Sequence, residues 1–278
     1  MKTSNQILLY DDYCPLCSWY SGLFVKFKLL NPENRQPFSS ASEKIISLVD
    51  FERGRNEIPL IDPVNKTVLY GLDALLSILG KPFPSIERIG HLKPMHWFLS
   101  KLYKFISYNR KVVVAKKCRT GSIDCSPDFN IPYRLLLVFL SLTLMILSIG
   151  AVHSSVLSHI PFYSISKEQL LIATLSLTSI SYIAALLIPR RKSIEFFGQA
   201  SILTILTVLL LMPLLLLNNL MDLPDWLVVA YLGIVALMIG KEYFRRMHFI
   251  EKISKQLPLV FIHTTSMGLF ICYLFIIS

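Results

Sequence analysis

The chain has 278 residues, of which 53% are hydrophobic and 17% are charged, and its mean hydropathy is +0.54. This composition excludes an ordinary soluble domain and favours a membrane protein. Residues 1–134 carry 19 basic and 12 acidic side chains, so they contribute +7 to the formal net charge of +10. A basic region next to apolar segments favours an anionic lipid surface over a nucleic acid as its partner.

The first residues, "MKTSNQILLYDD", do not resemble a signal peptide, because their apolar run ends at Asp11 and Asp12. We therefore expect the first half of the chain to stay unexported. "QILLYD" predicts a buried strand, and "CPLCSWYSGLFVKFKLL" predicts a helix from its apolar spacing. Cys14 then falls at the helix N-cap and Pro15 at the first helical position.

The two cysteines of this motif are candidate redox residues. The positive helix end should lower the pKa of Cys14 and make it the attacking thiolate, with Cys17 one turn later as the resolving thiol. Asp11 and Asp12 should raise the pKa of Cys14, unless one of them is protonated and serves as a proton shuttle for Cys17.

A hairpin and a helix are predicted next along the chain. Ile58, Leu60 and Ile61 indicate a strand, residues 67–70 its partner, and residues 73–79 a helix.

An Ile-Pro pair entering such a hairpin is where proteins of the thioredoxin superfamily place a cis-proline. By that analogy Ile58 and Pro59 lie beside the dithiol, with a cis peptide between them and with the Ile58 backbone free to pair with a substrate chain. An ordinary trans proline at a strand edge is the alternative.

The segment "HLKPMHWFLSKLYKFISYNRKVVVAKK" interleaves aromatic and basic residues, and we expect it to lie along the anionic cytoplasmic membrane surface. His91 and His96 are interpreted as ordinary polar residues. Cys118 and Cys125 allow three interpretations: a zinc site shared with the first two cysteines, a second dithiol that exchanges with them, or two free thiols. Their spacing argues against zinc, and a reducing cytosol favours free thiols.

Five segments are long and apolar enough to cross a bilayer: residues 133–152, 169–188, 199–217, 226–240 and 257–277. Pro213 should kink or break the third span. The loops after the second and fourth spans hold eight basic residues, against one in the loops after the first and third. This asymmetry predicts a cytoplasmic N-terminal domain and an outward C-terminus, as in a bacterial inner-membrane protein. A four-span arrangement with one re-entrant segment is the alternative.

Ionisable residues are nearly absent from the spans, where they would mark an ion or proton path. His263 and Cys272 in the last span are interpreted as packed side chains. The sequence therefore gives no sign of a transport pathway.

Two blocks of the sequence resemble a known family. "YDDYCPLC" resembles the D-x-x-C-x-x-C signature of the DCC family of thiol-disulfide oxidoreductases, and "YGLDALLSIL" is similar to that family's second block. "CPLC" and "IPLIDPVNKTVLYGLD" are also similar to the corresponding parts of glutaredoxins. The likeness covers roughly residues 5–112, and Asp12 stands where the family usually has glycine.

The resemblance implies a thioredoxin-like fold and thiol-disulfide exchange. The residues that it assigns to the active site are Asp11, Cys14 and Cys17. The residues that it places at the substrate-binding side are Ile58, Pro59, Gly71 and Asp73.

Together these observations predict an α/β thioredoxin-like domain over residues 1–84, a basic and aromatic juxtamembrane segment over 85–132, and an all-α transmembrane helical bundle of about five spans over 133–278. The predicted function is membrane-anchored disulfide exchange with a disulfide-containing protein or a low-molecular-weight thiol. The cysteine pair is the redox group, and no metal, other cofactor or nucleic acid is expected. The alternative is a transport or scaffold protein whose redox-like domain senses thiol state or binds a partner.

Overall fold

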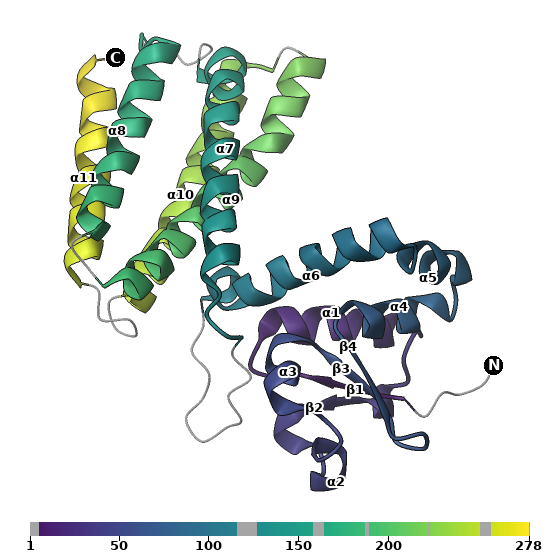
Figure 1. Ribbon diagram of the computed structural model, residues 1–278. Helices are drawn as coiled ribbons and strands as arrows, with labels where there is room; N and C mark the ends of the chain where they lie inside the picture. Colours follow the sequence, from purple (N-terminus) through teal and green to yellow (C-terminus); the bar gives the residue numbers. More distant parts are fainter. Residues whose placement is uncertain are drawn as a thin grey trace. The chain divides into compact units, whose positions relative to one another are not determined.

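The computed structural model describes residues 6–115, 127–157, 164–186, 189–221, 223–250 and 257–277. The chain divides into two compact units, Met1–Tyr133 and Arg134–Ser278. Figure 1 shows a small sheet with helices in the first unit and long helices in the second.

The first unit contains a four-stranded sheet of order β2-β1-β3-β4. Its strands are β1 (Ile7–Tyr10), β2 (Arg35–Pro37), β3 (Pro59–Asp62) and β4 (Thr67–Tyr70). Strand β1 runs parallel to β2 and antiparallel to β3, and β3 pairs antiparallel with β4. Its helices are α1 (Pro15–Lys26), α2 (Glu43–Ile46), α3 (Phe51–Asn56), α4 (Leu72–Gly80), α5 (Pro84–Gly90) and α6 (Lys93–Val114), with 3-10 turns at Pro32–Asn34 and Phe38–Ser40.

Strand β1 is covered on both faces, as its uninterrupted apolar run predicts. Successive side chains of a strand point to opposite faces, so Leu8 and Leu9 enter different cores. Leu8 packs in a cluster that includes Leu60 of β3 and Ile78 of α4. Leu9 packs with Phe38 and Ile61 on the other face. This double cover holds the end of β1, and hence the motif that follows it, in place.

The local predictions for this unit are confirmed where the sequence pattern is strong. The hairpin is β3 and β4, and the helix that follows it is α4, with Gly71 as its N-cap. Strand β2 was not predicted, because three residues of sequence Arg-Gln-Pro carry no alternating pattern and pair only through the neighbouring β1.

The second unit consists of long helices. These are α7 (Ile131–Ser155, which begins just before the division), α8 (Lys167–Leu186), α9 (Arg190–Leu220), α10 (Asp225–Phe249) and α11 (Leu257–Ile277). Among the described residues, four segments are long and apolar enough to cross a membrane: Ile131–Ser155, Lys167–Ala185, Arg190–Leu220 and Asp225–Phe249. At most 22% of the most apolar window of each is buried inside the protein, so most of its side chains require an apolar surrounding. These helices indicate an integral membrane protein.

The predicted span count of five is met only in part. The fifth predicted span coincides with α11, but its apolar stretch counted over the described residues, Val260–Phe270, is shorter than a full span. Of the kink or break expected at Pro213, the break does not occur, because helix α9 continues through this residue to Leu220. A proline can remain inside a membrane helix where neighbouring groups compensate its missing hydrogen bond.

Candidate active site

The turn between β1 and α1 places the first cysteine at a helix end. The Asp11 carboxylate accepts a hydrogen bond from the Tyr13 N–H at 3.0 Å, and its carbonyl accepts one from the Cys14 N–H at 3.2 Å. These bonds close a tight turn, after which α1 begins at Pro15 with Cys14 as its N-cap. The predicted helix start is confirmed, and Cys14 lies where the unpaired N–H groups and the positive end of α1 favour an anion.

The two sulfur atoms lie side by side and differ in acidity. Both cysteines are free thiols; Cys14 is 8% exposed and Cys17 is 2% exposed. The pKa of Cys14 is lowered to about 7, first because the Cys17 thiol donates a hydrogen bond to its sulfur. The Cys17 backbone N–H and the charge of Arg110 lower it further, against burial and Asp11. The pKa of Cys17 is raised, because that same hydrogen bond and burial both favour its neutral form. Cys14 is therefore the more easily ionised of the two thiols, and Cys17 stays protonated.

Arg110 is the residue of this site that the sequence analysis missed. It comes from α6, is 7% exposed, and directs Nη1 to Cys17 Sγ at 3.8 Å. Its Nη2 donates to the Arg55 carbonyl at 2.6 Å and lies 3.9 Å from the Asp11 carboxylate. A buried guanidinium beside two thiols stabilises a thiolate. In the sequence Arg110 was one of many basic residues in an aromatic-rich stretch, and only its tertiary position distinguishes it.

Asp11 lies next to the two thiols. One of its carboxylate oxygens and the sulfur atoms of Cys14 and Cys17 are all within 4.8 Å of one another. Its pKa is raised, mainly by burial, although Arg110 opposes the shift. Burial outweighs the charge of Arg110, and the negative charge of Asp12 adds to the rise. A carboxyl whose pKa moves towards that of a thiol can accept and return a proton. Asp12 turns away and accepts a hydrogen bond from Ser39 at 2.9 Å.

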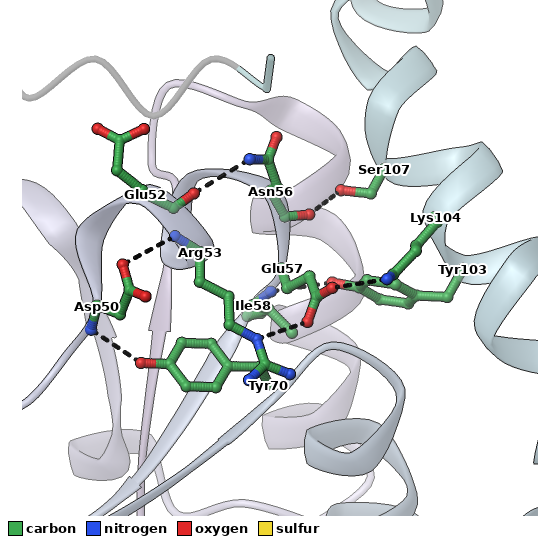
Figure 2. Close-up of polar contacts among 10 residues, drawn as sticks. All are labelled: Asp50, Glu52, Arg53, Asn56, Glu57, Ile58, Tyr70, Tyr103, Lys104 and Ser107. Carbon is green, nitrogen blue, oxygen red and sulfur yellow. Dashed lines mark hydrogen bonds and ion pairs between the residues drawn. The ribbon is translucent and has the colours of Figure 1, made fainter. Parts of the chain in front are cut away.

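A polar network attaches α6 to α3 and the start of β3 (Figure 2). The Ser107 hydroxyl donates to the Asn56 carbonyl, and Lys104 pairs with Glu57 at 3.6 Å. The Tyr103 hydroxyl accepts a hydrogen bond from the Ile58 N–H at 2.9 Å. These contacts occupy consecutive turns of α6, so they set the helix register that brings Arg110, one turn further, to the thiols.

Ile58 and Pro59 differ from their predicted arrangement. Among the described residues there is no cis peptide bond, so the Ile58–Pro59 bond is trans, which most X-Pro bonds prefer. The Ile58 backbone is not free either. Its N–H is bound to Tyr103, and its carbonyl accepts from the Gly71 N–H at 2.9 Å. The expectation of a free Ile58 backbone was wrong, because the Tyr103 hydroxyl and the Gly71 N–H occupy both of its polar groups.

Gly71 and Asp73 lie at the entry to α4. Gly71 has φ +59°, and a Cβ there would lie 3.0 Å from the Tyr103 ring and 3.2 Å from Glu57. Only glycine fits this conformation and this close approach without strain. Asp73 lies 2.8 Å from His96 Nε2, so its carboxylate is joined to the first turn of α6.

Two groups of side chains have the ligand types that bind metals. Asp11 with the two cysteines is one, and Asp73 with His91 and His96 is the other. Positive charge lies beside both. Arg110 adjoins the first group, and Lys93, Lys101 and Lys104 line the hollow next to the two histidines. This charge weakens cation binding, and we assign no metal to either group.

Cys118 and Cys125, for which a second dithiol was one of three interpretations, lie outside the described residues. Comparisons of the chain with protein-family models, with curated proteins and with solved structures gave no match. The chemistry of the cysteine site therefore carries the functional proposal.

Proposed function

We propose that this protein is a membrane-anchored thiol-disulfide oxidoreductase whose catalytic groups are Cys14 and Cys17. One observation carries the proposal. A thiol with a pKa of about 7 caps a helix next to a second thiol whose pKa is raised, and a buried arginine contacts this second thiol. An asymmetric dithiol of this kind is suited to disulfide exchange.

We further propose a thioredoxin-like fold for the first unit. Support comes from the order of its elements: β1, the CxxC motif, α1, a parallel β2, then the antiparallel pair β3 and β4 followed by α4. A CxxC at the strand-to-helix turn of such a βαβ unit is typical of thioredoxin-like redox sites. The resemblance of "YDDYCPLC" to the DCC family signature supports the same assignment.

The first step is attack by the Cys14 thiolate on one sulfur of a substrate disulfide. A new Cys14–substrate disulfide forms, the substrate S–S bond breaks, and its other sulfur leaves as a thiolate. Because about half of the Cys14 thiol is ionised at pH 7, this step needs no base. Before this attack, the positive charge of Arg110 stabilises the Cys14 thiolate of the free enzyme.

The second step releases the substrate. Asp11 accepts the proton of Cys17, and the Cys17 thiolate attacks Cys14 Sγ and breaks the mixed disulfide. The departing substrate thiolate takes the proton back from Asp11. The substrate is reduced by two electrons and the enzyme holds a Cys14–Cys17 disulfide, which a low-molecular-weight thiol or a protein dithiol then reduces.

The asymmetry of basic loops supports a cytoplasmic position for this unit, and a reducing cytosol favours the reductase direction. The reductive partner is then a thiol of that compartment. The four apolar helices anchor the enzyme in the bilayer.

The test measures reduction of a fluorescent glutathione disulfide by the full chain in lipid nanodiscs. Cys14→Ser should abolish reduction, and Cys17→Ser should accumulate a mixed disulfide that mass spectrometry detects. Cys272→Ser is the matched control, because Cys272 is an exposed thiol in α11 outside the site. Full activity of folded Cys14→Ser protein would refute the assignment.

A redox titration distinguishes catalysis from a purely structural or partner-binding role. A catalytic pair should cycle between dithiol and disulfide within the range of the glutathione or thioredoxin couples. A pair that stays reduced under all these conditions would contradict the proposal and favour the structural role.

A further inference from the structure

Helix α6 carries an exposed apolar stripe. Its residues recur every three or four positions, which places them on one side of a helix. The members of the stripe, with the exposed fraction of each side chain, are Met95 (39%), Phe98 (56%), Leu102 (43%) and Ile106 (48%). An apolar row of this length on a soluble surface is costly to hydrate, so it requires a cover.

The neighbouring helix extends the stripe. Helix α5 packs against α6 and against α4, where Gly90 lies too close to Leu76 for any side chain to be added. The apolar side chains of this region that stay exposed are Phe83, Ile86, Ile89 and Leu92. We call these four and the stripe on α6 the α5–α6 apolar surface.

The apolar surface is not part of the core of the first unit. The inner side of α6 carries Tyr103, Ser107 and Arg110, which contact Ile58, Asn56 and Cys17 respectively. Helical spacing places the stripe on a different side of α6 from these residues. What covers the stripe must therefore come from outside this group of helices and strands.

The charges around the stripe favour an anionic partner. A third side of α6 carries Lys93, Lys101 and Lys104, together with Trp97, which is 65% exposed. These residues line a hollow of about 440 Å³ with the two histidines. An apolar side flanked by lysines and a tryptophan is typical of a helix that lies in the headgroup layer of an anionic bilayer.

The bilayer is also within reach of α6 along the chain. Helix α6 ends at Val114 and the first candidate span begins at Ile131. An extended chain spans up to about 3.5 Å per residue, so a linker of this length allows α6 to reach the membrane surface.

We propose that the α5–α6 apolar surface lies in the interfacial layer of an anionic phospholipid bilayer, with the lysines of α6 directed at lipid phosphates. This inference goes beyond disulfide exchange and does not depend on it. Arg110 is on the same helix, so the proposal also places the thiol site near the membrane surface.

The test uses spin labels on the full chain, in a background whose five native cysteines are changed to serine, in liposomes that contain phosphatidylglycerol. One label is placed by Leu102→Cys. The matched control is Val64→Cys in the β3–β4 turn, also exposed, at 70%. Collision with oxygen, which concentrates in lipid, is compared with collision with a water-soluble nickel chelate. The ratio of oxygen to nickel collisions should be several-fold higher at Leu102 than at Val64.

Two results would overturn the proposal. Equal ratios at the two positions mean that the surface faces water. Low collision rates with both reagents at Leu102 mean that protein covers it, either another part of the chain or a second copy.

The double variant Lys93→Glu with Lys101→Glu tests the role of the lysines. It should lower the ratio of oxygen to nickel collisions at Leu102, and an unchanged ratio would contradict the role assigned to the lysines. Labelling at Phe98 repeats the measurement, and a thermal melt confirms that each variant is folded.

Discussion

Replacing Arg110 with methionine should raise the pKa of Cys14 while leaving the fold intact. Arg110 Nη1 lies 3.8 Å from Cys17 Sγ, and the two sulfur atoms lie within 4.8 Å of each other. A separation of about 6 Å between the guanidinium and the Cys14 thiolate, at an effective dielectric constant of about 20, gives an attraction of roughly 3 kcal/mol. That value would correspond to about two pKa units.

The net change should be smaller than the full attraction. Without Arg110 the pKa of Asp11 rises further, so Asp11 carries less negative charge and opposes the thiolate less. The hydrogen bonds from Cys17, which contribute most to the lowered pKa of Cys14, remain. We therefore expect a rise of about one unit, or about 1.4 kcal/mol.

The assay is the pH dependence of Cys14 alkylation by iodoacetamide, followed by mass spectrometry. The native rate should be half-maximal near pH 7, since the pKa of Cys14 is lowered to about 7. A pKa near 8 reduces the thiolate fraction at pH 7 from about one half to about one tenth, so the rate should fall about fivefold. Arg110→Lys keeps a charge without the planar guanidinium and should lie between the two.

Lys104→Met is the matched control, because it removes one positive charge from the same helix at a side chain that is 44% exposed. It should leave the alkylation profile of Cys14 nearly unchanged. Arg110→Met also leaves the Arg55 carbonyl without its 2.6 Å bond, so a thermal melt must show that the variant is folded. An unchanged profile in folded Arg110→Met protein, or an equal shift in Lys104→Met, would refute the reasoning.

Three further changes test other parts of the first unit. Asp11→Asn should slow resolution of the mixed disulfide by roughly 100-fold with little effect on its formation, because Asp11 accepts the proton of Cys17. Rapid-quench mass spectrometry separates the two steps, and equal slowing of both would contradict this role. Tyr103→Phe removes the acceptor of the buried Ile58 N–H and should cost about 1–3 kcal/mol of unfolding free energy, measured by urea denaturation of the full chain in nanodiscs. Leu60→Ala, at a site 1% exposed, should cost about 2–5 kcal/mol in the same assay, and a loss under 1 kcal/mol would mean that the core has closed around the gap.

The sequence alone was sufficient where the signal is local. The apolar run before the motif, Pro15 after Cys14, and Gly71 before α4 each act on their own few residues, and the elements begin where these residues predict. The apolar helices are found where hydropathy predicts them, since a bilayer requires about 20 apolar residues in one run. These features follow from backbone geometry and composition, which a single segment contains.

The cysteine site needed the tertiary structure. Arg110 contacts Cys17 across 93 positions of sequence, and Tyr103 reaches Ile58 across 45. The same packing engages both polar groups of the Ile58 backbone, which the analogy with the thioredoxin superfamily placed free beside the dithiol. Thus the sequence determined that a dithiol caps a helix in a membrane-bound chain. Only the fold decided which charge it meets and how deeply it is buried, because desolvation and long-range contact set the acidity of the thiols.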